Sequence, residues 1–168
     1  MRNKKVKKLA VMGLCAAIAL ILSYVEVVLP PIFAAVPGIK IGLANICVIF
    51  ALYRFGVLDA AVISLVRLII VAVLFGNPMT FIYSLAGAAL SLAVMAILKR
   101  FDFMSGVGVS VAGGVMHNVG QVIIAMLLLR TAEIGYYMVV LTFTGIVSGI
   151  FVGLCGGLLI KHLPKNKF

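Results

Sequence analysis

Long apolar segments, separated by short polar or Gly/Pro-rich breaks, run through almost the whole 168-residue chain. Several approach the ~20 residues that an α-helix needs to cross the hydrocarbon core of a bilayer. Lipid cannot satisfy backbone N–H and C=O groups, and the alternation of a barrel strand is missing, so the spans are predicted to be helices. The pattern predicts one all-α transmembrane domain over residues 1–168, with six helices at residues 9–29, 41–53, 57–75, 79–98, 107–129 and 136–160.

The first apolar segment needs a separate test, because basic residues followed by an apolar run also begin secretory signal peptides. Residues 9–29 form an apolar stretch of 21 residues, which exceeds the 7–15 of a typical signal-peptide core. We therefore interpret this segment as the first transmembrane helix.

Composition supports a membrane protein and argues against a nucleic-acid partner. The chain is 65% hydrophobic and only 11% charged, whereas soluble domains carry about a quarter charged residues. Its net charge of +10 is concentrated in the opening MRNKKVKK and at the ends of apolar segments. No basic face interleaved with aromatic residues is present, as single-strand binding would require. We expect a multi-pass protein of the cell membrane, surrounded by lipid.

The distribution of lysine and arginine predicts the orientation. With six spans and a cytoplasmic N-terminus, Lys40 and Arg130 are the two basic residues outside. The eleven on the cytoplasmic side are Arg2, Lys4, Lys5, Lys7, Lys8, Arg54, Lys99, Arg100, Lys161, Lys165 and Lys167. If residues 41–53 did not cross, the count would become six against seven. Because cytoplasmic loops carry the excess of basic residues, we predict six spans with both termini cytoplasmic.

The fifth span carries a continuous polar and small-residue face. Its members follow helical spacing: Ser110, Gly113, Gly114, His117, Asn118 and Gln121. A polar face at this depth points to the protein interior or to a water-filled cavity. Two interpretations stay open: the side chains line a ligand site, or they form interhelical hydrogen bonds that hold the bundle together.

Arg67 is the costliest residue in the apolar segments. It lies ten residues into the third span, about 15 Å deep, at a depth similar to His117, and no acid is expected close to that depth. An intramembrane arginine is a candidate functional residue; the alternative is that it caps loop carbonyls. The remaining polar groups predict a cavity that opens outward and has its floor near Arg67 and His117; these groups are Glu26, Lys40, Asn45, Asn77, Ser84 and Gln121.

Small residues mark other helix faces. The sixth span has a stripe of Gly145, Gly149, Gly153 and Gly156, which we expect to serve close helix packing. The face of the fourth span from Ser84 to Met95 is also expected to serve mainly packing. In the first span Gly13 and Ala17 form a small-xxx-small pair, for an internal contact or for docking a partner protein. The three isolated cysteines show no metal-site spacing, and no metal or cofactor is expected.

Three stretches carry a family resemblance: PGIKIGLANICVIFALYRFG (37–56), SLAGAALSLAVMAILKR (84–100) and SVAGGVMHNVGQ (110–121). They resemble the Gx transporter family, also known as heptaprenyl diphosphate synthase component I, over nearly the whole chain. That family is similar to the substrate-binding S components of energy-coupling factor (ECF) importers. The resemblance implies a six-helix S-component fold that works with a transmembrane T component and two cytoplasmic ATPases. It also implies docking through small residues of the first helix, here Gly13 and Ala17, with glycine in place of the usual first alanine.

The synthase name is tested by the residues themselves. Prenyl transfer to diphosphates relies on Mg²⁺ held by clustered carboxylates. The only aspartates, Asp59 and Asp102, lie in opposite loops and are 43 residues apart (59 to 102), so no catalytic function is expected of this chain. The sequence also lacks a Walker-type G-x-x-x-x-G-K-[ST], so ATP hydrolysis would come from partners.

The sequence therefore predicts an S-component-like membrane protein that captures a small organic molecule from outside, with anionic molecules among the candidates. The predicted substrate-binding residues are Arg67, His117, Asn118, Gln121, Lys40, Asn45 and Ser84. Vitamins, flavins, and quinone or isoprenoid precursors fit this expectation. The alternative is a non-catalytic membrane subunit associated with polyprenyl diphosphate synthesis.

Overall fold

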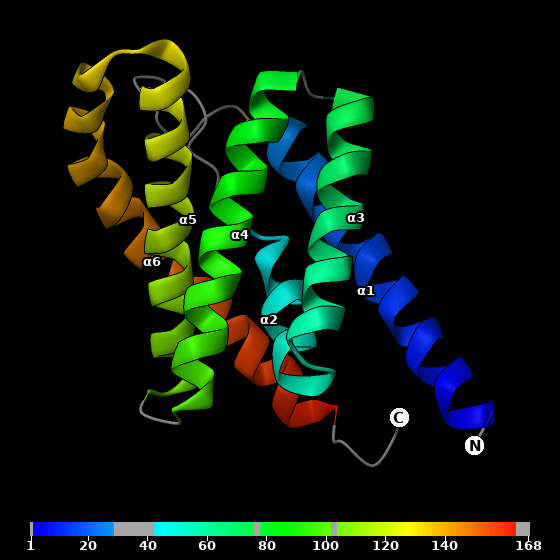
Figure 1. Cartoon of the computed structure of the whole chain (residues 1–168). Coiled ribbons are helices and arrows are strands. Elements are labelled where there is room, and N and C mark those ends of the chain that lie inside the picture. Colours follow the sequence, from blue (N-terminus) through cyan, green and yellow to red (C-terminus); the bar gives the residue numbers. More distant parts are fainter. Residues whose placement is uncertain (1, 29–41, 76–77, 102–103, 164–168) are drawn as a thin grey trace.

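The computed structural model describes residues 2–28, 42–75, 78–101 and 104–163, and these residues are almost entirely helical. The helices are α1 (Arg2–Val28), α2 (Asn45–Arg54), α3 (Val57–Phe75), α4 (Pro78–Arg100), α5 (Gly106–Leu129) and α6 (Met138–His162). A short 3-10 helix, η1 (Ala132–Tyr137), connects α5 to α6. Figure 1 shows α1 and α3 to α6 running along the bundle, with α2 enclosed in its lower half.

Local residue chemistry explains several boundaries. Pro78 opens α4, where its missing N–H costs nothing because the first turn has no intrahelical acceptor. Ser105 caps α5 by accepting a hydrogen bond from the Gly108 N–H at 3.2 Å. Gly56, at φ +113°, makes the tight turn between α2 and α3, a backbone conformation that favours glycine.

The boundaries agree closely with the sequence pattern for the third to sixth segments and differ for the first two. α1 begins at Arg2 because the basic opening continues the helix beyond its apolar part. The segment predicted over residues 41–53 contains only a ten-residue helix, α2, about 15 Å long. That is roughly half the hydrocarbon thickness. Among the described residues, five helices are long and apolar enough to cross a membrane. The sixth crossing remains a prediction, because residues 29–41 lie outside the described part of the chain.

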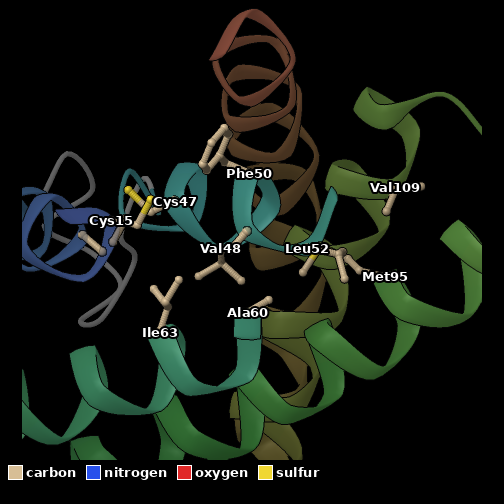
Figure 2. Close-up of a cluster of buried hydrophobic side chains, with 12 residues drawn as sticks. Cys15, Cys47, Val48, Phe50, Leu52, Ala60, Ile63, Met95 and Val109 are labelled. Atoms are coloured by element: carbon tan, nitrogen blue, oxygen red, sulfur yellow. The ribbon is translucent and has the colours of Figure 1, made fainter. Parts of the chain in front are cut away.

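α2 is the centre of the apolar core. Every residue from Cys47 to Leu52 is buried, as expected for a short helix that is apolar on all sides. Figure 2 shows its side chains surrounded by those of four other helices: Cys15 of α1, Ala60 and Ile63 of α3, Met95 of α4 and Val109 of α5. Burial on all sides explains why so short a helix is stable here.

The glycine stripe of α6 packs against its neighbours, as predicted. A Cβ added at Gly149 would lie 2.6 Å from the Cα of Val111 in α5, and one at Gly156 would lie 2.4 Å from a methyl carbon of Ile49 in α2. Such distances leave no room for a side chain, so the glycines set how closely α5 and α6 approach.

α1 has one buried and one exposed face. Cys15, Ala19 and Ser23 are buried, whereas Gly13 and Ala17 are exposed, and a Cβ added at Gly13 would meet nothing within 4 Å. Of the two interpretations of this pair, an internal contact is therefore wrong for the described residues. The pair faces outward.

α1 begins and α6 ends at the same end of the bundle (Figure 1), and basic side chains make contacts between helices there. Lys8 of α1 pairs with Asp59 of α3 at 2.7 Å. Arg54 at the end of α2 donates to the carbonyl of Ile160 in α6, and Lys99 of α4 donates to the carbonyl of Leu52. The bonds from Arg54 and Lys99 satisfy carbonyls in the last turns of α6 and α2. These carbonyls have no intrahelical donor. The assignment of this end to the cytoplasm remains a prediction.

Candidate functional site

A cavity of about 80 Å³ lies between the helices at the level where α2 begins. Each of the helices α1 to α6 contributes to the cavity wall, which is rich in polar side chains. The lining residues are Ser23, Glu26, Gly42, Asn45, Arg67, Leu68, Val71, Ser84, Gly114, His117, Asn118, Gln121 and Ser148. At roughly 10–15 Å³ per water molecule, the cavity holds several waters or a compact polar ligand group.

The structure brings together six of the seven residues predicted to bind substrate. Arg67 comes from α3, Ser84 from α4 and Asn45 from the first turn of α2. His117, Asn118 and Gln121 come from the polar face of α5. Lys40, the seventh, lies outside the described residues. Residues up to 76 positions apart (45 to 121) thus share one cavity, although their role in binding stays a prediction.

Arg67 is 7% exposed, and its Nε has no hydrogen-bond partner within the described part of the chain. One acid lines the same cavity, as the polar groups in the sequence predicted. Glu26, at the upper end of α1, lines the same cavity and interacts electrostatically with the Arg67 guanidinium. The sequence placed Glu26 near the outer surface, but its cavity position brings an acid and a base from two helices to one site.

Glu26 also fixes the backbone that leads into α2. Its Oε1 accepts a hydrogen bond from the Leu43 N–H at 2.5 Å. Gly42, at φ +76°, adopts the left-handed conformation that glycine favours, and its carbonyl accepts the N–H of Asn45 at 2.9 Å. The carboxylate therefore orders the entry to α2 as well as facing Arg67.

Asn118 makes a hydrogen bond of the kind that the packing interpretation of the α5 face predicts, whereas the ligand-site interpretation stays a prediction. Its Nδ2 donates to the carbonyl of Leu141 in α6 at 2.6 Å, which is an interhelical hydrogen bond. Gly145 makes this contact possible, since a Cβ there would lie 3.0 Å from the same nitrogen. The side chain also lines the cavity. Asn118 thus holds α5 and α6 together at the cavity wall.

Close packing of α4 on α5 positions His117 and Gln121. A Cβ added at Gly87 in α4 would lie 2.6 Å from the His117 carbonyl oxygen and 2.9 Å from the Gln121 Cγ. Gly120, on the same side of α5, would meet the Ala86 carbonyl oxygen at 2.9 Å. The two glycines let the helices approach until both polar side chains reach the cavity.

A second, smaller cavity of about 20 Å³ lies on the side of the first one toward the basic end of the bundle. It shares Asn45, Gly114 and Ser148 with the larger cavity, and its wall includes Ser91 and Ser110. The predicted floor near Arg67 and His117 is therefore not the end of the polar interior. The volume is enough for about one water molecule.

Three polar cavity residues were missing from the predicted substrate-binding set: Ser23, Glu26 and Ser148, of which Glu26 was expected to outline the cavity. For Ser23 and Glu26 the sequence did carry a signal. The two residues follow Cys15 and Ala19 at helical spacings of four and three, so they continue the same buried face of the first helix. Ser148 lies three residues after Gly145 on the packed face of α6. Serine and an acid near a helix end are common at surfaces, so their inward position was not evident from residue type.

The fold and site define an all-helical, multi-pass membrane protein whose helices enclose a polar cavity containing a buried arginine. The chain belongs to the family described as heptaprenyl diphosphate synthase component I, whose model matches residues 15–159. Comparison with curated proteins gave no match, and comparison with solved structures gave none either.

Within the described residues, the acids do not form a cluster of carboxylates. Asp59 is paired with Lys8 at the basic end of the bundle, away from the cavity. Glu26 is the only carboxylate among the cavity residues, whereas Mg²⁺-dependent prenyl transfer uses several. What the cavity offers is one charge pair with amide, hydroxyl and imidazole groups around it, which can recognise a polar molecule.

Proposed function

We propose that this protein is the substrate-binding, S-component-like subunit of an ECF-type importer in the cell membrane. It captures a small organic molecule from outside and delivers it with the help of a T component and cytoplasmic ATPases. The family resemblance motivates this proposal. The observation that carries it is that polar residues of five helices, otherwise costly in a membrane, share one cavity with the buried Arg67 of α3.

The cavity residues limit the class of substrate. Arg67 favours a ligand with an anionic group such as a carboxylate or phosphate, because its guanidinium donates in a geometry that matches these groups. Gln121, Asn118 and His117 supply hydrogen bonds on the α5 side. A vitamin, a flavin, or a quinone or isoprenoid precursor with a polar head fits this description.

Ligand-dependent thermal stabilisation of the purified full-length chain tests the proposal. Cys15 and Cys47 are buried, so a thiol-reactive fluorophore reports unfolding, and the chain has no tryptophan. A substrate at 100 times its Kd stabilises the folded state by about 2.7 kcal/mol, which raises Tm by several degrees. A panel of vitamins, flavins, quinones and prenyl phosphates is screened for this shift.

Variants assign the shift to the cavity. The double variant Arg67→Ala, His117→Ala is expected to lose the response to the stabilising compound. The matched control is Arg130→Ala, His162→Ala, which removes the same residue types at exposed positions outside the cavity. Equal stabilisation of both double variants contradicts the site, and a panel without any stabilising compound contradicts capture.

A second candidate function rests on the description of the family, which names a component of a heptaprenyl diphosphate synthase. In that role the chain is a non-catalytic membrane subunit that holds a partner synthase at the bilayer. The polar α5 face then serves helix packing, for which the bond from Asn118 to Leu141 is an example.

A further inference from the structure

The two cavities adjoin each other along α5. The larger one is lined by α5 residues from Gly114 to Gln121, and the smaller one by α5 residues from Ser110 to Gly114. Asn45 of α2 and Ser148 of α6 line both cavities. The shared residues make the smaller cavity a continuation of the larger one, toward the end of the bundle where α5 begins.

Two serine hydroxyls of the smaller cavity have no protein partner among the described residues. Ser91 of α4 is 6% exposed and Ser110 of α5 is 4% exposed, and both line this cavity. Neither hydroxyl makes a hydrogen bond to another described residue, whereas the Ser148 hydroxyl donates to the Gly145 carbonyl at 3.3 Å. Buried polar groups in proteins usually have a partner, so these two hydroxyls can bond to a molecule that enters the cavity.

The rest of the wall limits what the smaller cavity can hold. Ile49, Met95 and Val152 form its apolar side, and within the described residues no charged side chain lines it. A buried charge without a counter-charge is strongly unfavourable, so the cavity suits an uncharged group. Its volume of about 20 Å³ is enough for a group the size of a water molecule, such as a hydroxyl or a carbonyl.

The spacing along α5 sets the length of a molecule that reaches both cavities. Ser110 precedes His117 by seven residues (110 to 117), which is two helical turns or roughly 10 Å. His117 lines the larger cavity together with Arg67, the residue proposed above to hold an anionic group. An extended chain rises by about 3.3–3.6 Å for every three bonds, so roughly eight or nine bonds cover this length.

Resting on the capture function proposed above, we propose that the two cavities form one elongated ligand site, in which Ser91 and Ser110 bind an uncharged hydrogen-bonding end group. The ligand has an anionic group at Arg67 and a hydroxyl, carbonyl or amide group at its other end, roughly 10 Å away. The serine hydroxyls both donate and accept hydrogen bonds, so they select such an end group against a methyl group.

Cysteine labelling tests whether small molecules reach the smaller cavity, and it requires no knowledge of the ligand. Ser110→Cys is treated with methyl methanethiosulfonate, and the mass of the tryptic peptide is followed over time. Ser84→Cys, in the larger cavity, is the positive control. Ser64→Cys is the matched negative control, because Ser64 is buried in α3 outside both cavities. The three tryptic peptides contain no native cysteine; they cover residues 101–130, 68–99 and 55–67.

The labelling rates are expected to follow the cavities. We expect Ser110→Cys to react at least about tenfold faster than Ser64→Cys, because a cysteine enclosed by protein is inert. Its rate should approach that of Ser84→Cys. Equal rates for Ser110→Cys and Ser64→Cys overturn the continuous site.

A series of hydroxy acids tests the end group. ω-Hydroxynonanoate has about the required length, γ-hydroxybutyrate is too short, and nonanoate carries a methyl group in place of the hydroxyl. The readout is the Tm of the full-length chain as the concentration of each compound is raised. For the wild type we expect ω-hydroxynonanoate to bind at least about fivefold more tightly than either of the other two, because only its hydroxyl reaches the serines.

The double variant Ser91→Ala, Ser110→Ala is expected to bind ω-hydroxynonanoate and nonanoate equally. The matched control is Ser64→Ala, Thr144→Ala, which removes two hydroxyls outside both cavities and should keep the preference. If the double serine variant does not fold, the wild-type preference and the labelling of Ser110→Cys still decide the proposal.

Three binding results also overturn the elongated site: equal binding of ω-hydroxynonanoate and nonanoate by the wild type, a preference that survives in the double serine variant, or no stabilisation by any of the three compounds. Failure of the capture function is recognised separately. If a compound of the broad panel stabilises the wild type through Arg67 and His117 and stabilises the double serine variant equally, capture stands and the elongated site alone is rejected.

Discussion

Arg67 occupies a position where an unpaired charge is strongly disfavoured, and its surroundings explain how it is tolerated. Burial at mid-membrane depth costs several kcal/mol unless the charge is compensated. Glu26 supplies a nearby opposite charge, and the cavity provides space for water or ligand around the guanidinium. The Arg67 Nε has no hydrogen-bond partner within the described chain, whereas most buried polar groups in proteins have one.

Asn118 allows the structural and ligand roles of the α5 face to be separated. Asn118→Ala removes the bond from Nδ2 to the Leu141 carbonyl. Interhelical hydrogen bonds in membranes average about 0.6 kcal/mol, so we expect the free energy of unfolding to fall by that order and Tm to fall slightly. The stabilisation that a ligand gives is expected to fall far more than the stability of the ligand-free chain.

Thr144→Ala is a control, since the Thr144 hydroxyl bonds to the same carbonyl at 2.9 Å but lies outside the cavity wall. Loss of stability with unchanged ligand response makes Asn118 structural only.

At the scale of elements, glycine spacing determines how α4, α5 and α6 approach one another. Gly149→Ala places a methyl group 2.6 Å from the Cα of Val111 in α5, whereas Gly157, on the same helix, has open space. Overpacking of this kind costs about 1–3 kcal/mol. We expect Gly149→Ala to lower Tm clearly and Gly157→Ala to leave it unchanged or raise it slightly, because alanine is the better helix former. Equal Tm values in the two variants contradict the packing role.

The elements also show what sequence patterns predict and what they leave out. The face from Ser110 to Gln121 was predictable because helical spacing makes it continuous, and its neighbours in the sequence are apolar. The hydrogen bond from the Leu43 N–H to Glu26 was not, because the position of the backbone before α2 relative to α1 depends on the fold. The length of α2 was not predictable either: apolar residues at 41–44 extend the pattern, while the helix begins only at Asn45.

At the scale of the whole molecule, the two halves of the bundle differ in how they are packed. α4, α5 and α6 are held together by glycines with almost no space between them. α1 contacts mainly α2 and α3 and exposes a face that includes Ala10, Gly13 and Ala17. Small residues that mediate no contact within the described chain form a smooth helix surface, which suits close approach of another transmembrane helix.

Gly13→Leu tests whether this outward face docks a transport partner. Gly13 is exposed, a Cβ added there meets nothing within 4 Å, and leucine favours a helix, so the variant is expected to fold with an unchanged Tm and to bind ligand normally. Bulk at a close helix contact prevents the approach, so co-purification of a T component and ATPases from native membranes should drop sharply. Gly157→Leu, also in open space but on α6, is the matched control and should retain the partners.

Retention of the partners by Gly13→Leu contradicts docking through this face. Recovery of a prenyl synthase in place of an ATPase module supports the subunit role that the family description names, because the surface then serves enzyme assembly and not transport.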